Sequence, residues 1–155
     1  MTKDSQIALV RRDGLAIRDI INPDIEIQMV AVEQNGYAIK YINNPDKKVQ
    51  IAAVKQIGYA ISYIDNPDKD VQLESIKKDF QAIYYISSEE VQLEAIKQSV
   101  YAITYMNKPY KQVQIEAIKR SKFDNKIIKY CEKFREYKEY AEWVEGVIKM
   151  KEILG

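Results

Sequence analysis

The chain has 155 residues, of which 46% are hydrophobic and 30% charged, so it holds enough apolar side chains for one continuous core. It contains one cysteine and no histidine, which excludes an internal disulfide framework and the Cys/His sets of structural zinc sites. The formal net charge of +1 gives no general attraction to nucleic acid. No apolar run is long enough to cross a membrane or to form a secretory leader. We therefore expect a soluble cytoplasmic protein with no membrane partner.

A repeated pattern fills most of the chain. The segments VQIAAVKQ, VQLESIKK, VQLEAIKQ and VQIEAIKR mark four copies, an earlier copy precedes them, and a weaker one comes first. The six copies begin near Ser5, Ile27, Val49, Val71, Val91 and Val113. Their spacing is 22 residues except for one interval of 20, where the shorter ISSEEVQ replaces INNPDKKVQ. Because length changes confined to a loop leave packed helices in register, the pattern predicts tandem helical units.

Each copy contains two short segments with apolar periodicity. The first has apolar residues at its start and two, four and five positions later, which covers more than one side of a helix and predicts that this helix is sandwiched. The second begins ten residues after the start and has one apolar face, which predicts a half-exposed helix. One column of the first segment consists of β-branched residues: Val10, Val32, Val54, Ile76, Ile96 and Ile118.

The expected fold is all-α, an α-solenoid of short helical hairpins over residues 1–121, because one such hairpin cannot bury both of its faces alone. Residues 122–155 break the repeat and are expected to form a C-terminal amphipathic helical cap in the same compact unit, as one long helix or two shorter ones. The alternative for this tail is a dimerising or partner-binding helix. Its predicted apolar face comprises Tyr130, Phe134, Tyr137, Ala141, Val144 and Ile148.

The residues between the helical segments give local predictions. Asn22-Pro23 and its counterparts precede the first segment, where Pro suits the first helical turn and Asn can cap it. Gly14, Gly36 and Gly58 lie between the two segments and are expected to be left-handed residues that end the first helix. A column of glutamines is expected to hydrogen-bond the loop of the adjacent copy: Gln6, Gln28, Gln50, Gln72, Gln92 and Gln114.

The run from Ala31 to Tyr41, AVEQNGYAIKY, resembles the AV-x-QNG-x-AL-x-Y repeat of a helical family known only as a domain of unknown function. That family is familiar from large DNA viruses and intracellular bacteria. The resemblance spans roughly residues 5 to 121 and is strongest in the second and third copies, since later copies lose the glycine. It implies a helical repeat fold and carries no catalytic residues to transfer.

Catalytic chemistry finds little support in these residues. The most common general base is absent because the chain has no histidine, and no phosphate-binding loop or nucleophile elbow occurs. Glu74, Glu94 and Glu116 each precede a lysine by three residues, which is typical of ion pairs on a solvated helix face. We therefore expect a protein that is not an enzyme and that has no catalytic residues, cofactor or metal site.

Tyrosines recur in two columns of the second segment. Aromatic side chains with a polar tip are typical interface anchors, so these columns are the candidate partner-binding residues. The alternative is that each tyrosine packs on the next copy and only its hydroxyl reaches water. The candidates are Tyr37, Tyr41, Tyr59, Tyr63, Tyr85, Tyr101 and Tyr105.

Charge is uneven along the chain, with eight acids and three lysines from Asp65 to Glu94 and eight bases and two acids from Lys97 to Lys129. The basic cluster is a candidate contact for nucleic acid or an acidic partner: Lys108, Lys111, Lys119, Arg120, Lys122, Lys126 and Lys129. The favoured function is a protein–protein interaction module, an inhibitor or adaptor from a phage or mobile element. The alternative is RNA or DNA binding through the basic region, and homodimerisation through the C-terminal helices is a further expectation.

Overall fold

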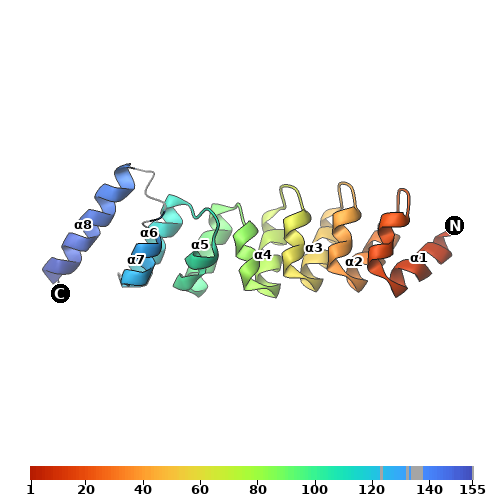
Figure 1. The fold of residues 1–155 in the computed structure, drawn as a ribbon, viewed down its shortest axis with the longest axis horizontal. Coiled ribbons are helices and arrows are strands. Elements are labelled where there is room, and N and C mark those ends of the chain that lie inside the picture. The colour runs from red at the N-terminus through yellow and green to blue at the C-terminus, as the bar shows by residue number, and fades with distance from the viewer. Residues whose placement is uncertain (123, 132, 134–137, 155) are drawn as a thin grey trace. The chain divides into compact units, whose positions relative to one another are not determined.

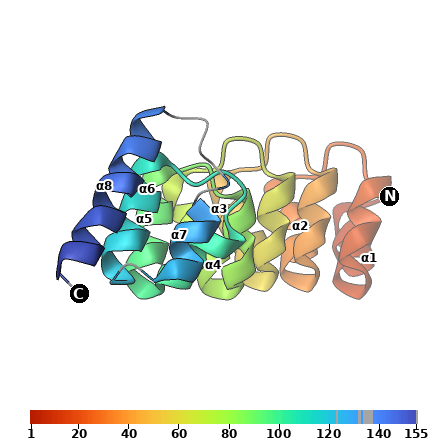
Figure 2. The ribbon, with the colours of Figure 1, turned by 60° about the vertical axis from the view of Figure 1, so that its left-hand side comes forward.

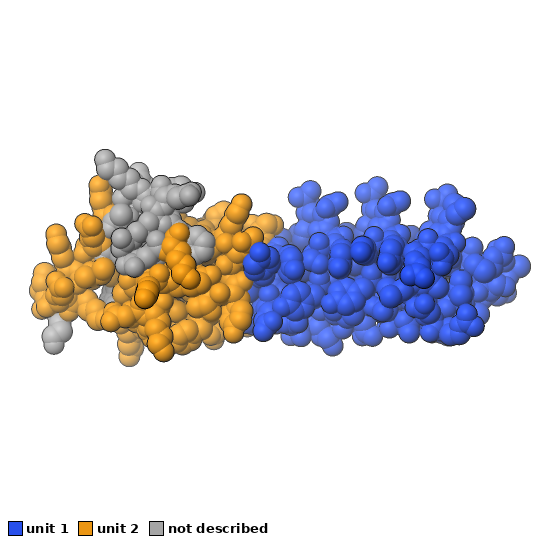
Figure 3. Space-filling model, viewed as in Figure 1, with its two compact units in different colours: residues 1–85 blue, residues 86–155 orange. Residues whose placement is uncertain are grey.

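The computed structural model describes residues 1–122, 124–131, 133 and 138–154, and all regular elements in this part of the chain are helices (Figure 1). Up to Tyr105, ten-residue α-helices alternate with six-residue 3-10 helices. The chain divides into two compact units, residues 1–85 (unit 1) and residues 86–155 (unit 2), coloured separately in Figure 3. An all-helical fold of short helices packed in succession is thereby confirmed.

Unit 1 contains four α-helices, each followed by a 3-10 helix. They are α1 (Lys3–Arg12), η1 (Gly14–Asp19), α2 (Ile25–Gln34), η2 (Gly36–Tyr41), α3 (Lys47–Gln56), η3 (Gly58–Tyr63), α4 (Lys69–Lys78) and η4 (Phe80–Tyr85). Unit 2 contains α5 (Glu89–Gln98), η5 (Val100–Tyr105), α6 (Lys111–Arg120), α7 (Asn125–Cys131) and α8 (Lys138–Leu154). In unit 1 the loops after η1, η2 and η3 project from one edge, and their tips are separate protrusions in Figure 3.

The repeated apolar columns form the core of each unit. All six members of the β-branched column are buried: Val10, Val32, Val54, Ile76, Ile96 and Ile118. Each lies on an α-helix that packs against its neighbours within the same unit, α1 on α2, α2 on α3 and α3 on α4 in unit 1, and α5 on α6 in unit 2. From the second copy to the sixth, the first segment is buried at its start and four and five positions later, as at Ile27, Ala31 and Val32. The prediction that this segment packs on more than one side is confirmed for these copies.

The second segments are 3-10 helices, a tighter form than an ordinary α-helix. With three residues per turn, residues three apart lie on one face. Ile39 of η2 and Ile42, the residue that follows this helix, are three apart and both lie on the buried side, with Ala38 beside them. Tyr37 and Lys40, also three apart, lie on the exposed side with Tyr41. The half-exposed character predicted for this segment is therefore confirmed.

The predicted capping by Asn-Pro is wrong in its details. Asn22, Asn44 and Asn66 adopt φ values of 51°, 48° and 48°, the left-handed conformation that asparagine tolerates better than other side chains. Pro precedes the helix, and the following aspartate caps α2 and α3, whereas Asp68 makes no capping hydrogen bond to α4. At α2, Asp24 Oδ1 accepts hydrogen bonds from the backbone N–H groups of Glu26 and Ile27, at 3.0 and 3.1 Å. Aspartate satisfies two free N–H groups at once, and its charge suits a helix N-terminus.

The glycine prediction is also wrong, because no glycine in the described residues has positive φ. Glycine is required for a close approach between copies. A Cβ on Gly36 would lie 2.5 Å from the backbone oxygen of Ala53 in the next copy, and a Cβ on Gly14 would lie 2.4 Å from the oxygen of Ala31. Gly58 faces Ser75 in the same way, at 2.6 Å. These glycines let each 3-10 helix rest against the end of the following α-helix in unit 1.

The glutamine column mostly bonds its own loop, which corrects the expected contact to the adjacent copy. Gln28, Gln50 and Gln114 each donate from Nε2 to the carbonyl of the proline five residues earlier, at 2.8 to 2.9 Å. Gln92 makes the expected contact as well, because its Oε1 accepts from the backbone N–H of Tyr110 in the next copy at 3.2 Å. Gln114 belongs to the last copy, and its buried Oε1 has no hydrogen-bond partner in the described structure.

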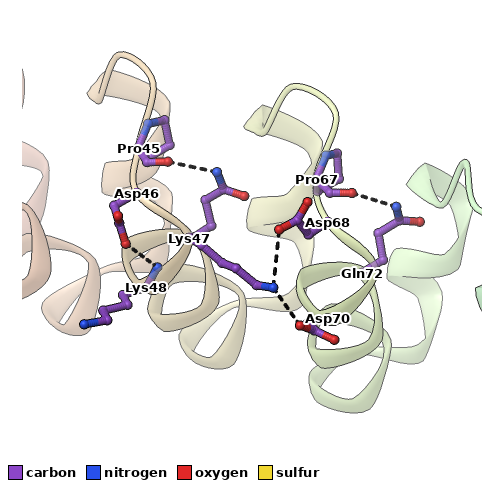
Figure 4. A network of polar contacts seen from close by, with 9 residues as sticks. Pro45, Asp46, Lys47, Lys48, Pro67, Asp68, Asp70 and Gln72 are labelled. Atoms are coloured by element: carbon purple, nitrogen blue, oxygen red, sulfur yellow. Dashed lines mark hydrogen bonds and ion pairs between the residues drawn. The ribbon is translucent and has the colours of Figure 1, made fainter.

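Ion pairs tie some neighbouring copies of unit 1 together at their helix N-termini. Lys47 Nζ at the start of α3 lies 3.3 Å from Asp68 and 2.7 Å from Asp70 at the start of α4 (Figure 4). Lys3 joins Asp24 and Glu26 in the same way, at 2.8 and 2.7 Å. The lysine contacts lower the pKa of Asp24 and Asp70 below the usual aspartate value. These carboxylates therefore stay charged at the positive end of the helix dipole.

The C-terminal tail forms two helices, α7 and α8. α7 packs against η5 and α6 and buries Ile127, Ile128 and Cys131. Lys151 Nζ of α8, the dark blue helix near the C-terminus in Figure 2, donates to Asn125 Oδ1 at the start of α7 at 3.1 Å. Of the predicted apolar face, Phe134 and Tyr137 lie outside the described residues. No described helix is both long and apolar enough to span a bilayer.

Substituting Gly36→Ala is expected to destabilise the protein by about 1 to 3 kcal/mol, because the new Cβ meets a backbone oxygen that cannot move aside alone. Gly146→Ala is the matched control, since nothing lies within 4 Å of a Cβ there. At this exposed position of α8, alanine should raise stability by up to about 1 kcal/mol. Urea unfolding followed by circular dichroism measures both. Equal effects of the two substitutions would contradict the close-approach argument.

The aspartates that pair with lysine make stability depend on pH. A carboxyl whose pKa is lowered by folding stabilises the native state above its unfolded pKa, 3.8 for Asp70, and this stabilisation is lost as pH falls. Lys47→Gln should therefore lower the thermal unfolding midpoint near neutral pH, and the difference from wild type should shrink below about pH 5. Lys48→Gln is the control, because the Lys48 side chain has no ion pair in the described structure. A midpoint difference that persists unchanged at pH 2 to 3, roughly, would refute this assignment.

Candidate partner-binding surface

Tyrosines gather on the exposed side of the 3-10 helices in unit 1. Tyr37, Tyr41, Tyr63 and Tyr85 are 39 to 45% exposed, and Tyr59 is half-buried. They are held in place because the opposite faces of η2, η3 and η4 are buried through Ala and Ile, and because η2 contacts η3 and η3 contacts η4. We call seven side chains of η2–η4 the tyrosine surface: Tyr37, Lys40, Tyr41, Tyr59, Tyr63, Tyr84 and Tyr85.

Tyrosines from successive copies pack edge to face. The ring centroids of Tyr37 and Tyr63 are 6.1 Å apart with planes at 90°, and those of Tyr59 and Tyr85 are 6.0 Å apart at 78°. Both pairs join the first tyrosine of one copy to the second tyrosine of the next, so the second pair repeats the first one copy further on. The rings pack on the next copy and remain partly exposed, and their role in binding a partner stays a prediction. Edge-to-face packing holds the rings in fixed orientations.

Two members of this surface are not in the predicted tyrosine columns. Lys40 Nζ lies 5.8 Å from the ring centroid of Tyr41 and 5.5 Å from that of Tyr63, within cation–π distance of both. Tyr84 packs against Tyr85, with centroids 5.1 Å apart. Both occupy the position between the tyrosine columns, where other copies carry Ser62 or Thr104. A search for repeated residues could not reveal them, because the residue at this position differs between copies. The position itself lies three residues after the first tyrosine column, on the exposed side of the 3-10 helix.

Hydrogen bonds fix individual hydroxyls of the tyrosine surface. Tyr59 Oη donates to Gln81 Oε1 of the next copy at 2.9 Å. Desolvation, with smaller effects from Asp79, Tyr85 and Tyr37, raises the pKa of Tyr59 above its ordinary value. Tyr59 therefore stays protonated and remains a donor to Gln81 throughout the physiological range.

The remaining predicted tyrosines belong to unit 2. Tyr101 and Tyr105 on η5 are 49% and 46% exposed. Tyr101 Oη donates to Asp124 Oδ2 at 3.1 Å, and this hydrogen bond to a carboxylate raises the pKa of Tyr101. The structure thus groups five of the seven predicted tyrosines in unit 1 and places two in unit 2.

The predicted basic cluster lies entirely in unit 2 and is divided by α6. Lys108 and Lys111 precede or begin this helix, whereas Lys119 lies near its end, about 12 Å further along at 1.5 Å per residue. Arg120, at the end of the helix, is engaged by Glu116 Oε1 at 3.5 Å. Lys122 follows the helix, and Lys126 and Lys129 belong to α7. The predicted cluster is therefore spread along α6, α7 and the residues beside them.

No group of three or more Cys, Asp or Glu residues in the described ranges is placed to hold a metal ion. No family model matches the chain, and neither a curated protein nor a solved structure matches it. The case for function therefore depends on the arrangement of this chain's own side chains.

Replacing Tyr37→Leu and Tyr63→Leu, singly and together, should reveal a coupling of about 0.5 to 1 kcal/mol in the free energy of unfolding, because each single substitution already removes the edge-to-face contact. Tyr41→Leu and Tyr85→Leu are the control pair, two copies apart, and should be additive within about 0.5 kcal/mol. Urea titrations of the four variants and two double variants give both couplings. A Tyr37–Tyr63 coupling no larger than that of the control pair would show that the rings do not stabilise one another.

Proposed function

We propose that this protein is a non-catalytic interaction module, an α-solenoid that binds a protein partner, as an adaptor or inhibitor, through the tyrosine surface of η2–η4. The observation that supports this function best is the presence of exposed tyrosines in regular register on three consecutive 3-10 helices. Tyrosine supplies a large, partly apolar contact area with little conformational entropy to lose, which is why it is enriched at the centre of protein interfaces.

Pre-ordering of the rings favours binding. Immobilising free side chains costs about 0.5 to 1.5 kcal/mol each at an interface. In the tyrosine surface, Tyr37 is already packed on Tyr63, and Tyr59 on Tyr85 and Gln81. A partner therefore meets rings whose orientations are largely set before it arrives.

The solenoid part of this proposal is supported by recurring contacts in unit 1. Each α-helix contacts the next α-helix, each 3-10 helix contacts the next α-helix, and the glycine approach occurs three times. Equivalent side chains of successive copies are thereby presented at regular intervals, as repeat proteins do along their binding surfaces.

Charge distinguishes a protein partner from nucleic acid at this surface. Nucleic-acid affinity comes largely from several cations that contact phosphates. The tyrosine surface has one cation, Lys40, and Arg18 on the preceding η1 lies 3.6 Å from its neighbour Asp19. The basic residues of unit 2 remain the alternative nucleic-acid contact, although they are spread along α6 and α7.

Tyr63→Ala combined with Tyr85→Ala is expected to abolish retention of a protein partner in affinity capture from the native host, because it removes one ring from each edge-to-face pair. Lys119→Glu with Lys126→Glu is the matched control: both side chains are exposed, lie in unit 2 and should leave capture intact. Circular dichroism verifies the folding of both double variants. Capture should also withstand raised salt, since the contact is mainly aromatic.

The opposite pattern would reject the proposal. If retention survives the tyrosine substitutions but fails with the lysine substitutions, with nuclease or with moderate salt, the basic groups of unit 2 bind nucleic acid instead.

A further inference from the structure

We infer that the partner segment is an extended, proline-rich peptide in the polyproline II conformation, with prolines three positions apart and an acidic residue beside them. This inference rests on the proposed function, since it specifies what the tyrosine surface binds. Three features of η2–η4 support it: the spacing of the aromatic pairs, the cation among them and the ring chemistry.

The interval expected between the two edge-to-face pairs matches the repeat of a polyproline II helix. Tyr37–Tyr63 and Tyr59–Tyr85 are equivalent pairs in consecutive copies. Packed helices lie about 8 to 10 Å apart, so equivalent pairs of consecutive copies are separated by about that distance. A polyproline II helix rises about 3.1 Å per residue with three residues per turn, so every third residue recurs about 9 Å along the same face. One proline can therefore contact each aromatic pair without distortion of either partner.

An extended β-strand matches this spacing less well. Residues on one face of a strand recur every two positions, about 6.6 Å apart, which falls out of step with the copies after one interval. An α-helix returns to the same face after one turn at about 5.4 Å and after two turns at about 10.8 Å, and neither value falls within the 8 to 10 Å interval. Among regular peptide conformations, polyproline II thus fits the interval between the aromatic pairs best.

Lys40 supplies the charge complementarity. Its ammonium lies 5.5 Å from the Tyr63 ring, beside the first aromatic pair. No carboxylate in the described part of the chain lies within ion-pair distance of it. The equivalent position in the next copy is Ser62, so the positive charge marks one end of the paired rings. An acidic residue on the peptide, flanking the proline that contacts Tyr37 and Tyr63, would neutralise this cation.

The chemistry of the rings suits proline. Proline-rich segments bind aromatic-lined surfaces because their conformation is preformed and loses little entropy on binding. Their carbonyl groups make no internal hydrogen bonds and are available to donors such as tyrosine hydroxyls. Tyr63 and Tyr85 present both an apolar ring and a hydroxyl at the exposed surface.

The experiment uses the full chain and three fluorescein-labelled peptides in an anisotropy titration. The matched peptide is Glu-Glu-Ala-Pro-Ala-Ala-Pro-Ala-Ala-Pro. The spacing control has the same composition with prolines two positions apart, Glu-Glu-Ala-Pro-Ala-Pro-Ala-Pro-Ala-Ala. The charge control replaces both glutamates of the matched peptide with lysines.

The matched peptide should bind about tenfold more tightly than either control, since each mismatch removes one good contact worth about 1.4 kcal/mol. Tyr63→Ala with Tyr85→Ala should weaken its binding by roughly tenfold or more. Lys40→Glu should reverse the charge preference, so that the lysine peptide binds better than the glutamate peptide. Retention of folding by Lys40→Glu is expected because the side chain is exposed.

Several results would overturn the inference. They are equal binding of the matched and spacing-control peptides, binding that ignores the tyrosine substitutions, absence of binding, or tighter binding of a labelled oligothymidylate to the same tyrosines. Capture of a native partner that is lost on Tyr63→Ala with Tyr85→Ala would preserve the proposed function even if the peptides fail. Loss of tyrosine dependence in both experiments would reject the function as well.

Discussion

The structure of each unit depends on the burial of one apolar column between successive copies. Val32 and Val54 each lie on a helix of ten residues, and the stability of such a short helix alone in water would be marginal. Both side chains are completely buried because the neighbouring helices cover them on two sides. Each copy thus completes the hydrophobic surroundings of the next, and the remaining features, from caps to tyrosines, are placed by this stacking.

The sequence predicted the apolar features well because burial imposes a strict period. The spacing of apolar residues predicted the β-branched column, the all-helical class and the half-exposed second segment. The two-residue deletion before Val91 lies in a loop, so it left the copies aligned. The predicted boundary at residues 121 and 122 remains a prediction, as does dimerisation through the tail. The division after Tyr85 is not marked by any change in the apolar columns.

The local errors share a physical cause. Glycine and asparagine each have two common uses, and a sequence does not say which one applies. Gly36 was expected to supply a left-handed conformation, but it supplies space for the carbonyl of Ala53, a contact between copies that no local pattern encodes. Asn44 was expected to cap a helix, but it takes the left-handed role and Asp46 provides the cap. Lys40 and Tyr84 were missed because they vary between copies, whereas repeats are found by what stays the same.

The ion pairs at the helix N-termini also specify the order of the copies. Lys3 and Lys47, at the starts of the first and third copies, pair with acids of the second and fourth copies. The second copy carries Ile25 at the position of these lysines. The third copy carries Lys48 where the second and fourth carry an acid. Moving the chain by one copy would place a lysine opposite Lys48. Moving it by two copies would restore a matching arrangement. The first residues of the four α-helices of unit 1 are Lys3, Ile25, Lys47 and Lys69, so the charges vary from copy to copy while the apolar core repeats. They distinguish neighbours that hydrophobic packing alone would treat as interchangeable.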